Sequence, residues 1–152
     1  MLTLEEMILR LIAAVVLGAI VGLERELVGK EAGIRTNILV AAGAAIFTMV
    51  GLNLPYLISL SETHLLEVIA RNSGFLSIIA NIVVGIGFLG AGIIFKEEHR
   101  ARGLTTAAAV WFTAALGILA GVGLTVFAAC AGIGLSVILF LLRNFSIIRR
   151  EE

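Results

Sequence analysis

The chain has 152 residues, and 60% of them are hydrophobic, well above the share of about 45–50% that is typical of soluble domains. Its mean hydropathy of +1.11 indicates an integral membrane protein, and we expect a single membrane domain over residues 1–152. The 11 basic and 11 acidic side chains cancel to a net charge of zero, so charge gives no reason to expect nucleic acid as a partner. The single cysteine, Cys130, lies in an apolar run and offers neither a disulfide nor a metal-ligand cluster.

Apolar segments long enough to cross a membrane follow one another along nearly the whole chain. A crossing helix needs about 20 mostly apolar residues, and five segments meet this requirement: 7–23, 37–54, 74–95, 104–120 and 122–142. The break between the last two depends on Gly121-Val122-Gly123 alone. We interpret them as a tight hairpin, because a single straight helix over both would extend about 60 Å. The sequence therefore predicts an all-α, compact five-helix transmembrane bundle.

Basic residues alternate between the connections. Loops that are rich in Lys and Arg stay in the cytoplasm. The first and third connections hold three basic residues each, Arg25, Lys30 and Arg35 in the first and Lys96, Arg100 and Arg102 in the third. The second connection holds only Arg71, and the fourth holds none. The C-terminal tail again holds three, Arg143, Arg149 and Arg150. This pattern predicts an N-terminus outside and a cytoplasmic C-terminus. Arg10 is the remaining base, and we expect its long stem to reach the outer surface.

Small and weakly polar residues recur at three- and four-residue spacing in every segment, which places them on one side of each helix. Such faces let helices approach closely in lipid, so we expect them to pack inside the bundle. A second interpretation is a narrow polar path lined by Ser77, Asn81, Thr48 and Thr113, although none of the segments has a carboxylate in its middle, as a cation path normally would. The faces are Ala14, Gly18, Gly22; Asn37, Ala41, Ala44, Thr48, Gly51; Gly74, Ser77, Asn81, Gly85, Gly92; Thr106, Ala109, Thr113, Gly117, Gly121; and Thr125, Ala129, Gly132, Ser136.

The residues from Gly85 to Gly90 match the letters of the dinucleotide-binding fingerprint. That motif works at a strand-to-helix turn and needs an acidic residue about 20 residues further on, whereas here it lies in an apolar run. We interpret Gly85, Gly87, Gly90 and Gly92 as sites of close helix packing or of a kink. The sequence carries no signal for catalysis, so we expect no enzyme activity, no cofactor and no bound metal.

Charged and polar residues gather at the helix ends that face the predicted cytoplasm. We expect Glu24 or Glu26 to form a polar cluster with Arg35, and Thr105 to be the N-cap or a first-turn residue of the fourth helix. Three interpretations stay open: a solvated loop that sets the orientation, a structural lock, or a site for a cation or a protein partner. The candidate cluster consists of Glu24, Arg25, Glu26, Lys30, Arg35, Thr36, Asn37, Thr105 and Thr106.

Four motifs in order, residues 22–26, 30–36, 85–92 and 103–108 with Trp111, resemble the MgtC/SapB family. The resemblance implies a multi-pass protein of the bacterial inner membrane, associated with growth in low magnesium and with survival inside phagocytes. It also implies a non-enzymatic, regulatory or stress-adaptation role through membrane-protein partners, including the rotary ATP synthase, and not magnesium transport. Many members carry a C-terminal cytoplasmic domain, for which this chain has no counterpart.

One family element differs in this chain. Members tend to have Asp-Pro-x-Arg and a Gln before the third span, and the aligned Asp, Pro, Arg and Gln positions are here Gly74, Phe75, Ser77 and Asn81. A rival hypothesis to the regulatory role is a transporter or channel for a cation or small solute. The pairs Gly18-xxx-Gly22 and Gly117-xxx-Gly121 are further candidates for contacts in a homo-oligomer, if they are not used within the bundle.

Overall fold

The computed structural model describes residues 1–59, 74–97 and 100–148. Its five helices are each long and apolar enough to cross a membrane, which confirms the predicted all-α architecture. They are α1 (Leu4–Leu27), α2 (Ile34–Ile58), α4 (Gly74–Ile93), α5 (Leu104–Val122) and α6 (Thr125–Ile148), with a two-stranded hairpin, β1 (Phe95–Glu97) and β2 (Arg100–Arg102), between α4 and α5. Arg71, Arg149 and Arg150 lie outside the described residues.

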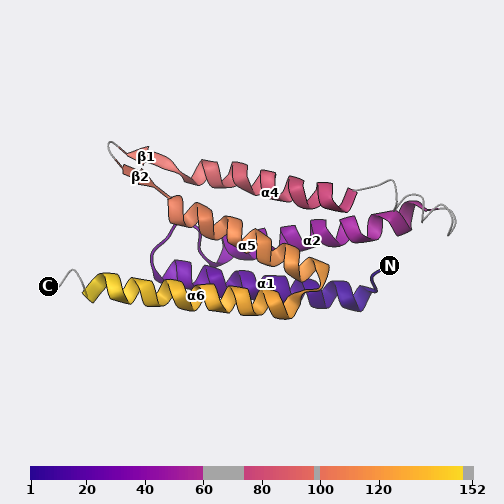
Figure 1. The fold of residues 1–152 in the computed structure, drawn as a ribbon, viewed down its shortest axis with the longest axis horizontal. Helices are drawn as coiled ribbons and strands as arrows, with labels where there is room; N and C mark the ends of the chain where they lie inside the picture. Colours follow the sequence, from indigo (N-terminus) through magenta and orange to yellow (C-terminus); the bar gives the residue numbers. More distant parts are fainter. Residues whose placement is uncertain (60–73, 98–99, 149–152) are drawn as a thin grey trace.

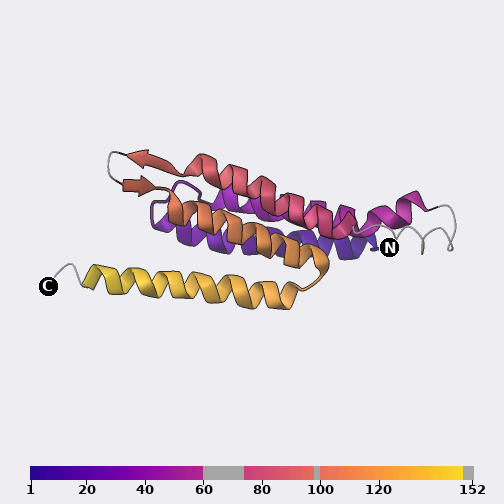
Figure 2. The same cartoon turned by 45° about the horizontal axis from the view of Figure 1, so that its top comes forward.

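The helices form a bundle whose centre is made by α1, α2 and α5. In this centre α2 packs against both α1 and α5. The helices α4 and α6 lie at opposite edges of the bundle in both views (Figures 1 and 2). Helix α4 packs against α5 and α2, whereas α6 packs against α1 and α5. The α1–α2 loop, the β-hairpin and the end of α6 share one end of the bundle, which we call the hairpin end; the α5–α6 turn and the N-terminus lie at the other, the turn end (Figure 1).

The start of α1 and the end of α5 differ from the expected boundaries because of local capping. Thr3 caps α1: its hydroxyl accepts from the Glu6 N–H at 3.2 Å, and the Glu6 carboxylate accepts from the Thr3 N–H at 2.8 Å, so the helix begins one turn before residue 7. Helix α5 continues through Gly121 and Val122. It ends at Gly123, whose φ of +105° suits glycine.

The β-hairpin was not expected from the sequence, which extended the third helix to residue 95. Helix α4 ends at Ile93, and Phe95 then pairs with Arg102 across the hairpin. The chain turns back tightly at Gly103, which has φ +82°; a Cβ there would lie 2.2 Å from the carbonyl oxygen of Ile93. Three-residue strands are too short to show a recognisable period, so hydropathy alone assigns them to the neighbouring helix.

Small residues bring the three central helices into contact, as predicted. A Cβ on Gly18 would lie 2.6 Å from the carbonyl oxygen of Asn37, and one on Gly117 would lie 2.3 Å from that of Ala41. Every residue of the expected faces on α1, α2 and α5 is buried. The pairs Gly18-xxx-Gly22 and Gly117-xxx-Gly121 are therefore used within the chain, where they hold α1 and α5 against α2.

The expected face of α4 does not point into the bundle, and this prediction was wrong. Ser77, Asn81, Gly85 and Gly92 are exposed, and a Cβ added at Gly85, Gly87 or Gly92 would meet nothing within 4 Å among the described residues. Gly90 makes only an ordinary contact, 3.7 Å from the Cβ of Ala107. On α6, Gly132 is buried, whereas Thr125, Ala129 and Ser136 are only partly buried.

The polar path considered above is not formed by the four residues expected to line it. Thr48 and Thr113 are buried, whereas Ser77 and Asn81 are exposed on α4. The Thr48 hydroxyl donates to the carbonyl oxygen of Ala44 in its own helix at 2.8 Å. The single proton of the Thr113 hydroxyl is shared between the carbonyl oxygen of Ala109 in its own helix, at 2.9 Å, and Asn37 Oδ1, at 2.8 Å. They act as satisfied polar groups within packed helices.

Long-range hydrogen bonds close the turn end. Arg10 Nη1 donates to the carbonyl oxygen of Gly121 at 2.8 Å, where the last turn of α5 leaves carbonyl groups without helical partners. Asn53 Oδ1 accepts from the backbone N–H of Leu2 at 2.8 Å. Arg10 thus holds the end of α5, a contact that the sequence did not predict.

Candidate functional site: a charged rim at the hairpin end

The charged residues predicted to form a cluster do come from one end of the bundle. We define the charged rim as the charged side chains of the end of α1, the α1–α2 loop, the start of α2 and the β-hairpin. The connections that hold these residues lie together at the hairpin end (Figure 1). The rim comprises Glu24, Arg25, Glu26, Lys30, Glu31, Arg35, Lys96 and Arg102.

Glu24 and Arg25 form the buried part of the rim. Arg25 is only 6% exposed, and its Nε donates to Glu24 Oε2. The other carboxylate oxygen of Glu24, Oε1, is buried and has no hydrogen-bond partner among the described residues. A paired carboxylate and guanidinium tolerate partial burial far better than either charge alone, so this pair is the fixed base of the rim.

Glu26 caps the neighbouring helix and does not pair with Arg35. Its Oε2 accepts from the backbone N–H of Ile34, the first residue of α2, at 2.9 Å. This contact places a negative charge at the positive end of α2. Gly33 makes room for it, because a Cβ there would lie 2.6 Å from the same oxygen. The expected pairing of Glu24 or Glu26 with Arg35 was therefore wrong. Glu24 pairs with Arg25 instead, and Glu26 contacts the N-terminus of α2.

Asn37 ties the α1–α2 loop to α2 and α5. It is fully buried. Its Nδ2 donates to the carbonyl oxygens of Ala32 and Gly33, both at 2.9 Å, and its Oδ1 accepts from the Thr113 hydroxyl at 2.8 Å. The side chain thus satisfies its amide and carbonyl groups within the protein. Asn37 gives the rim a rigid support, which corresponds to the structural lock among the interpretations considered above.

Glu31 connects the loop to α5 and was absent from the predicted cluster. Its Oε2 accepts from the Thr106 hydroxyl at 3.1 Å. The pKa of Glu31 lies below its usual value because of a hydrogen bond from its own backbone N–H, then the Thr106 hydroxyl, and then the charges of Lys30 and Arg102. The sequence contained no spacing that indicated this contact, because the two residues are 75 positions apart.

The remaining predicted members of the cluster differ in their exposure. Lys30, Arg35 and Thr105 are exposed, Thr36 is partly buried, and Thr106 is buried. Thr105 lies in the first turn of α5, one of its two expected positions, and the N-cap is Gly103, which has no side chain to accept a hydrogen bond. The rim therefore has a fixed inner layer and an outer layer of exposed charge, the arrangement of a surface that another molecule can contact.

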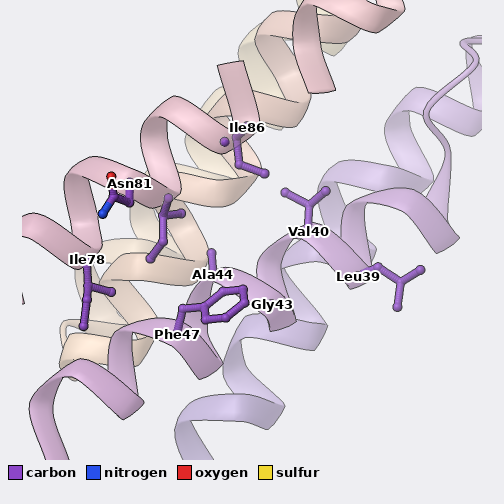
Figure 3. Close-up of a pocket in the computed structure, with 10 residues that line it drawn as sticks. Leu39, Val40, Gly43, Ala44, Phe47, Ile78, Asn81 and Ile86 are labelled. Carbon is purple, nitrogen blue, oxygen red and sulfur yellow. The ribbon is translucent and has the colours of Figure 1, made fainter. Parts of the chain in front are cut away.

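The predicted intramembrane residues lie away from the rim. Trp111 is half exposed on α5, and Asn81 is exposed on α4. Asn81 and Gly85 instead belong to the wall of a groove between α2 and α4, which Figure 3 shows with Ile78, Ile86 and Phe47. Within the described ranges, no three His, Cys, Asp or Glu residues come together as a metal-binding group.

The fold and the rim define a class of protein: a multi-pass helical membrane protein with a charged surface at one end of its bundle. The chain belongs to the MgtC family, whose model matches residues 11–147. It is 42% identical over 133 residues to Protein MgtC of Brucella abortus (strain 2308), covering 88% of this chain and 50% of that protein. It is 45% identical over 116 residues to Protein MgtC of Salmonella typhimurium (strain LT2), covering 76% of this chain and 43% of that protein.

The chain spans about half the length of the curated relatives it matches. No solved structure shows a significant match to it. The family membership confirms the resemblance seen in the motifs, and together with the five apolar helices it supports a membrane protein of the MgtC type.

Proposed function

We propose that this chain is a non-enzymatic regulatory factor of the bacterial inner membrane, active in adaptation to low magnesium or in virulence, which works by binding another membrane protein. The observation that carries the proposal is the build of the charged rim. Arg35 and Lys30 are exposed above a base that Asn37 fixes through hydrogen bonds to Ala32 and Gly33. A loop that is already held in place favours recognition of a partner, since little loop ordering opposes binding.

The rim would face the cytoplasm. The loops that hold three basic residues each lie at the hairpin end, and the α5–α6 turn at the opposite end holds none. This arrangement agrees with the distribution that keeps basic loops in the cytoplasm. The family resemblance makes the rotary ATP synthase the first candidate among the proteins that the rim would contact.

The interior gives less support to transport. Thr48, Thr113 and Asn37 are buried and hydrogen-bonded to protein groups, and the described parts of the five spans hold no acidic residue away from their ends. Cation pathways through membranes usually depend on such residues. Saturable flux of a cation into vesicles that contain the purified chain would overturn the regulatory proposal.

The proposal is tested with a single charge removed from the outer layer of the rim. Arg35→Ala should abolish capture of the partner from native membranes and growth in low magnesium, while the thermal unfolding of the purified protein stays the same, because Arg35 is exposed. Glu5→Ala removes an exposed charge at the turn end and should leave capture and growth intact. Normal capture and growth with Arg35→Ala would contradict the role of the rim.

We also propose that the chain associates with itself. The glycine pairs on α1 and α5 are already packed against α2, so self-association would use another surface.

A further inference from the structure

A groove of about 550 Å³ lies between α2 and α4, within the part of the bundle that spans the membrane. Its walls include Gly43 and Phe47 from α2 and Ile78, Asn81 and Gly85 from α4 (Figure 3). The lining runs over eight residue steps of each helix, from Leu39 to Phe47 and from Ile78 to Ile86, which corresponds to about 12 Å along the axis. The groove can therefore receive about two turns of another helix.

Asn81 is the polar member of this wall. It lies seven residues after Gly74, the first residue of α4, so it is about 10 Å along the axis of a helix about 30 Å long and lies within the hydrocarbon layer. Its side chain is exposed and makes no hydrogen bond to any residue that the structure describes. A carboxamide without partners is costly in hydrocarbon. Among the described residues, therefore, nothing supplies the partner that this carboxamide needs.

The backbone around Asn81 is open to close approach. A Cβ added at Gly85, Gly92 or Gly43 would meet nothing within 4 Å among the described residues. On α1, α2 and α5 the same pattern of small residues is buried against a neighbouring helix, and small residues at such spacing are what lets helix backbones meet in lipid. The face of α4 thus has the composition of a helix contact, and none of the described helices lies against it.

We propose that the groove receives α4 from a second copy of this chain, giving a two-fold dimer in which the two Asn81 side chains hydrogen-bond to each other. An asparagine amide carries both donors and an acceptor, so it is complementary to a copy of itself. Two copies inserted in the same orientation are related by an axis normal to the membrane, which places equal residues at equal depth. A second copy therefore supplies the partner that Asn81 lacks, at the depth required.

This inference rests on the proposed self-association and names its surface, and it does not depend on the rim. The first test is oxidative cross-linking of the full chain in vesicles of phosphatidylethanolamine and phosphatidylglycerol. Phe88 is 85% exposed on α4, one turn from Gly85, so Phe88→Cys in a Cys130→Ala background should give a covalent dimer. The matched control is the native chain, whose exposed Cys130 is on α6 at the opposite edge and should give none.

The second test measures association by energy transfer between terminally labelled copies as lipid is added. Asn81→Leu should weaken association about three- to eighteenfold, the range that interhelical hydrogen bonds in membranes allow. Gly85→Leu should weaken it as well, because its side chain blocks the close approach of the second helix. Gly134→Leu is the control, because Gly134 is also open to its surroundings but lies on α6.

The outcomes separate the surface from the self-association itself. If the native chain associates and Asn81→Leu and Gly85→Leu associate equally well, the surface is wrong and self-association stands. A native chain that is monomeric at every lipid ratio overturns both and leaves the groove to lipid, while the role of the rim is unaffected. Cross-linking of Phe88→Cys in native membranes only to a chain of different mass would assign the groove to another protein and overturn the dimer.

Discussion

The hydrogen bond between Thr113 and Asn37 can be isolated from the packing around it, because the chain contains its own control. Thr113 and Thr48 are both fully buried, on α5 and α2. The Thr48 hydroxyl donates only to the carbonyl oxygen of Ala44, four residues earlier in its own helix. The Thr113 hydroxyl makes the equivalent contact to Ala109 and also lies 2.8 Å from Asn37 Oδ1. Replacing each by valine keeps the shape and removes the hydroxyl, so the two variants differ mainly by one interhelical bond.

The expected free-energy change follows from that difference. Interhelical hydrogen bonds in membranes contribute about 0.6 to 1.7 kcal/mol, and the variant also leaves the buried Asn37 Oδ1 without a donor, so Thr113→Val should cost about 1–2 kcal/mol of unfolding free energy. Thr48→Val loses only a bond within its own helix and should change stability by about 0.5 kcal/mol or less. Combining Thr113→Val with Asn37→Ala should show a coupling energy of about 0.6–1.7 kcal/mol.

Equilibrium unfolding in bicelles by steric trapping measures all four variants under one condition. Asn37→Ala alone should be the most destabilising single change, because it also removes the hydrogen bonds to the carbonyl oxygens of Ala32 and Gly33. Equal losses for Thr113→Val and Thr48→Val, or a coupling energy of zero, would refute the idea that this bond joins α5 to α2.

Two further predictions concern helix approach and pH. Gly117→Ala should cost about 1–3 kcal/mol of unfolding free energy in the same assay, because its Cβ would lie 2.3 Å from the Ala41 carbonyl oxygen. Gly134→Ala is the control and should not destabilise the protein, because a Cβ there would meet nothing within 4 Å among the described residues. Equal losses of unfolding free energy for the two variants would count against the packing of α5 on α2. Thr106→Val should raise the pKa of Glu31 toward its usual 4.5, since it removes the second largest cause of the lowered value. A lowered pKa in the folded state means that the stabilisation is complete above the unfolded value and is lost as the pH falls through the folded one. Carboxyl carbon NMR of Glu31 measures the shift, and an unchanged pKa would rule out the Thr106 contact in solution.

The buried faces of the three central helices could be predicted from the sequence, because the spacing of small residues marks them. In α1, α2 and α5, small residues three and four positions apart mark the buried side, and residues such as Gly18, Ala41 and Gly117 are buried as expected. The rule identifies a face that can pack closely, but not the helix that packs on it. For that reason it placed Asn81 and Gly85 inside a bundle in which they are exposed.

The composition of the rim was predicted only in part, without Glu31, Lys96 and Arg102, and its pairing was not predicted. Its charges were identified from their place at the helix ends, yet Glu26 contacts the N-terminus of α2 and Glu31 contacts Thr106. Both contacts depend on the path of the loop between residues 28 and 33, which is set by backbone geometry and by Gly33 next to Glu26. Charge counts contain no information on that path, so they could not show that Glu26 would contact the N-terminus of α2 in place of Arg35.

The bond from Arg10 to Gly121 also has a consequence for the order of assembly during synthesis. The two residues are 111 positions apart, so at a synthesis rate of about 5–20 residues per second the carbonyl partner emerges roughly 6–22 s after the arginine. Over that interval the guanidinium of a newly inserted α1 has to stay at the membrane surface, since it has no protein acceptor at the end of α5. Asn53 emerges much sooner, only 51 positions after Leu2. The N-terminal helix is therefore joined to α2 first and takes its final depth only when the last helical hairpin has entered the membrane.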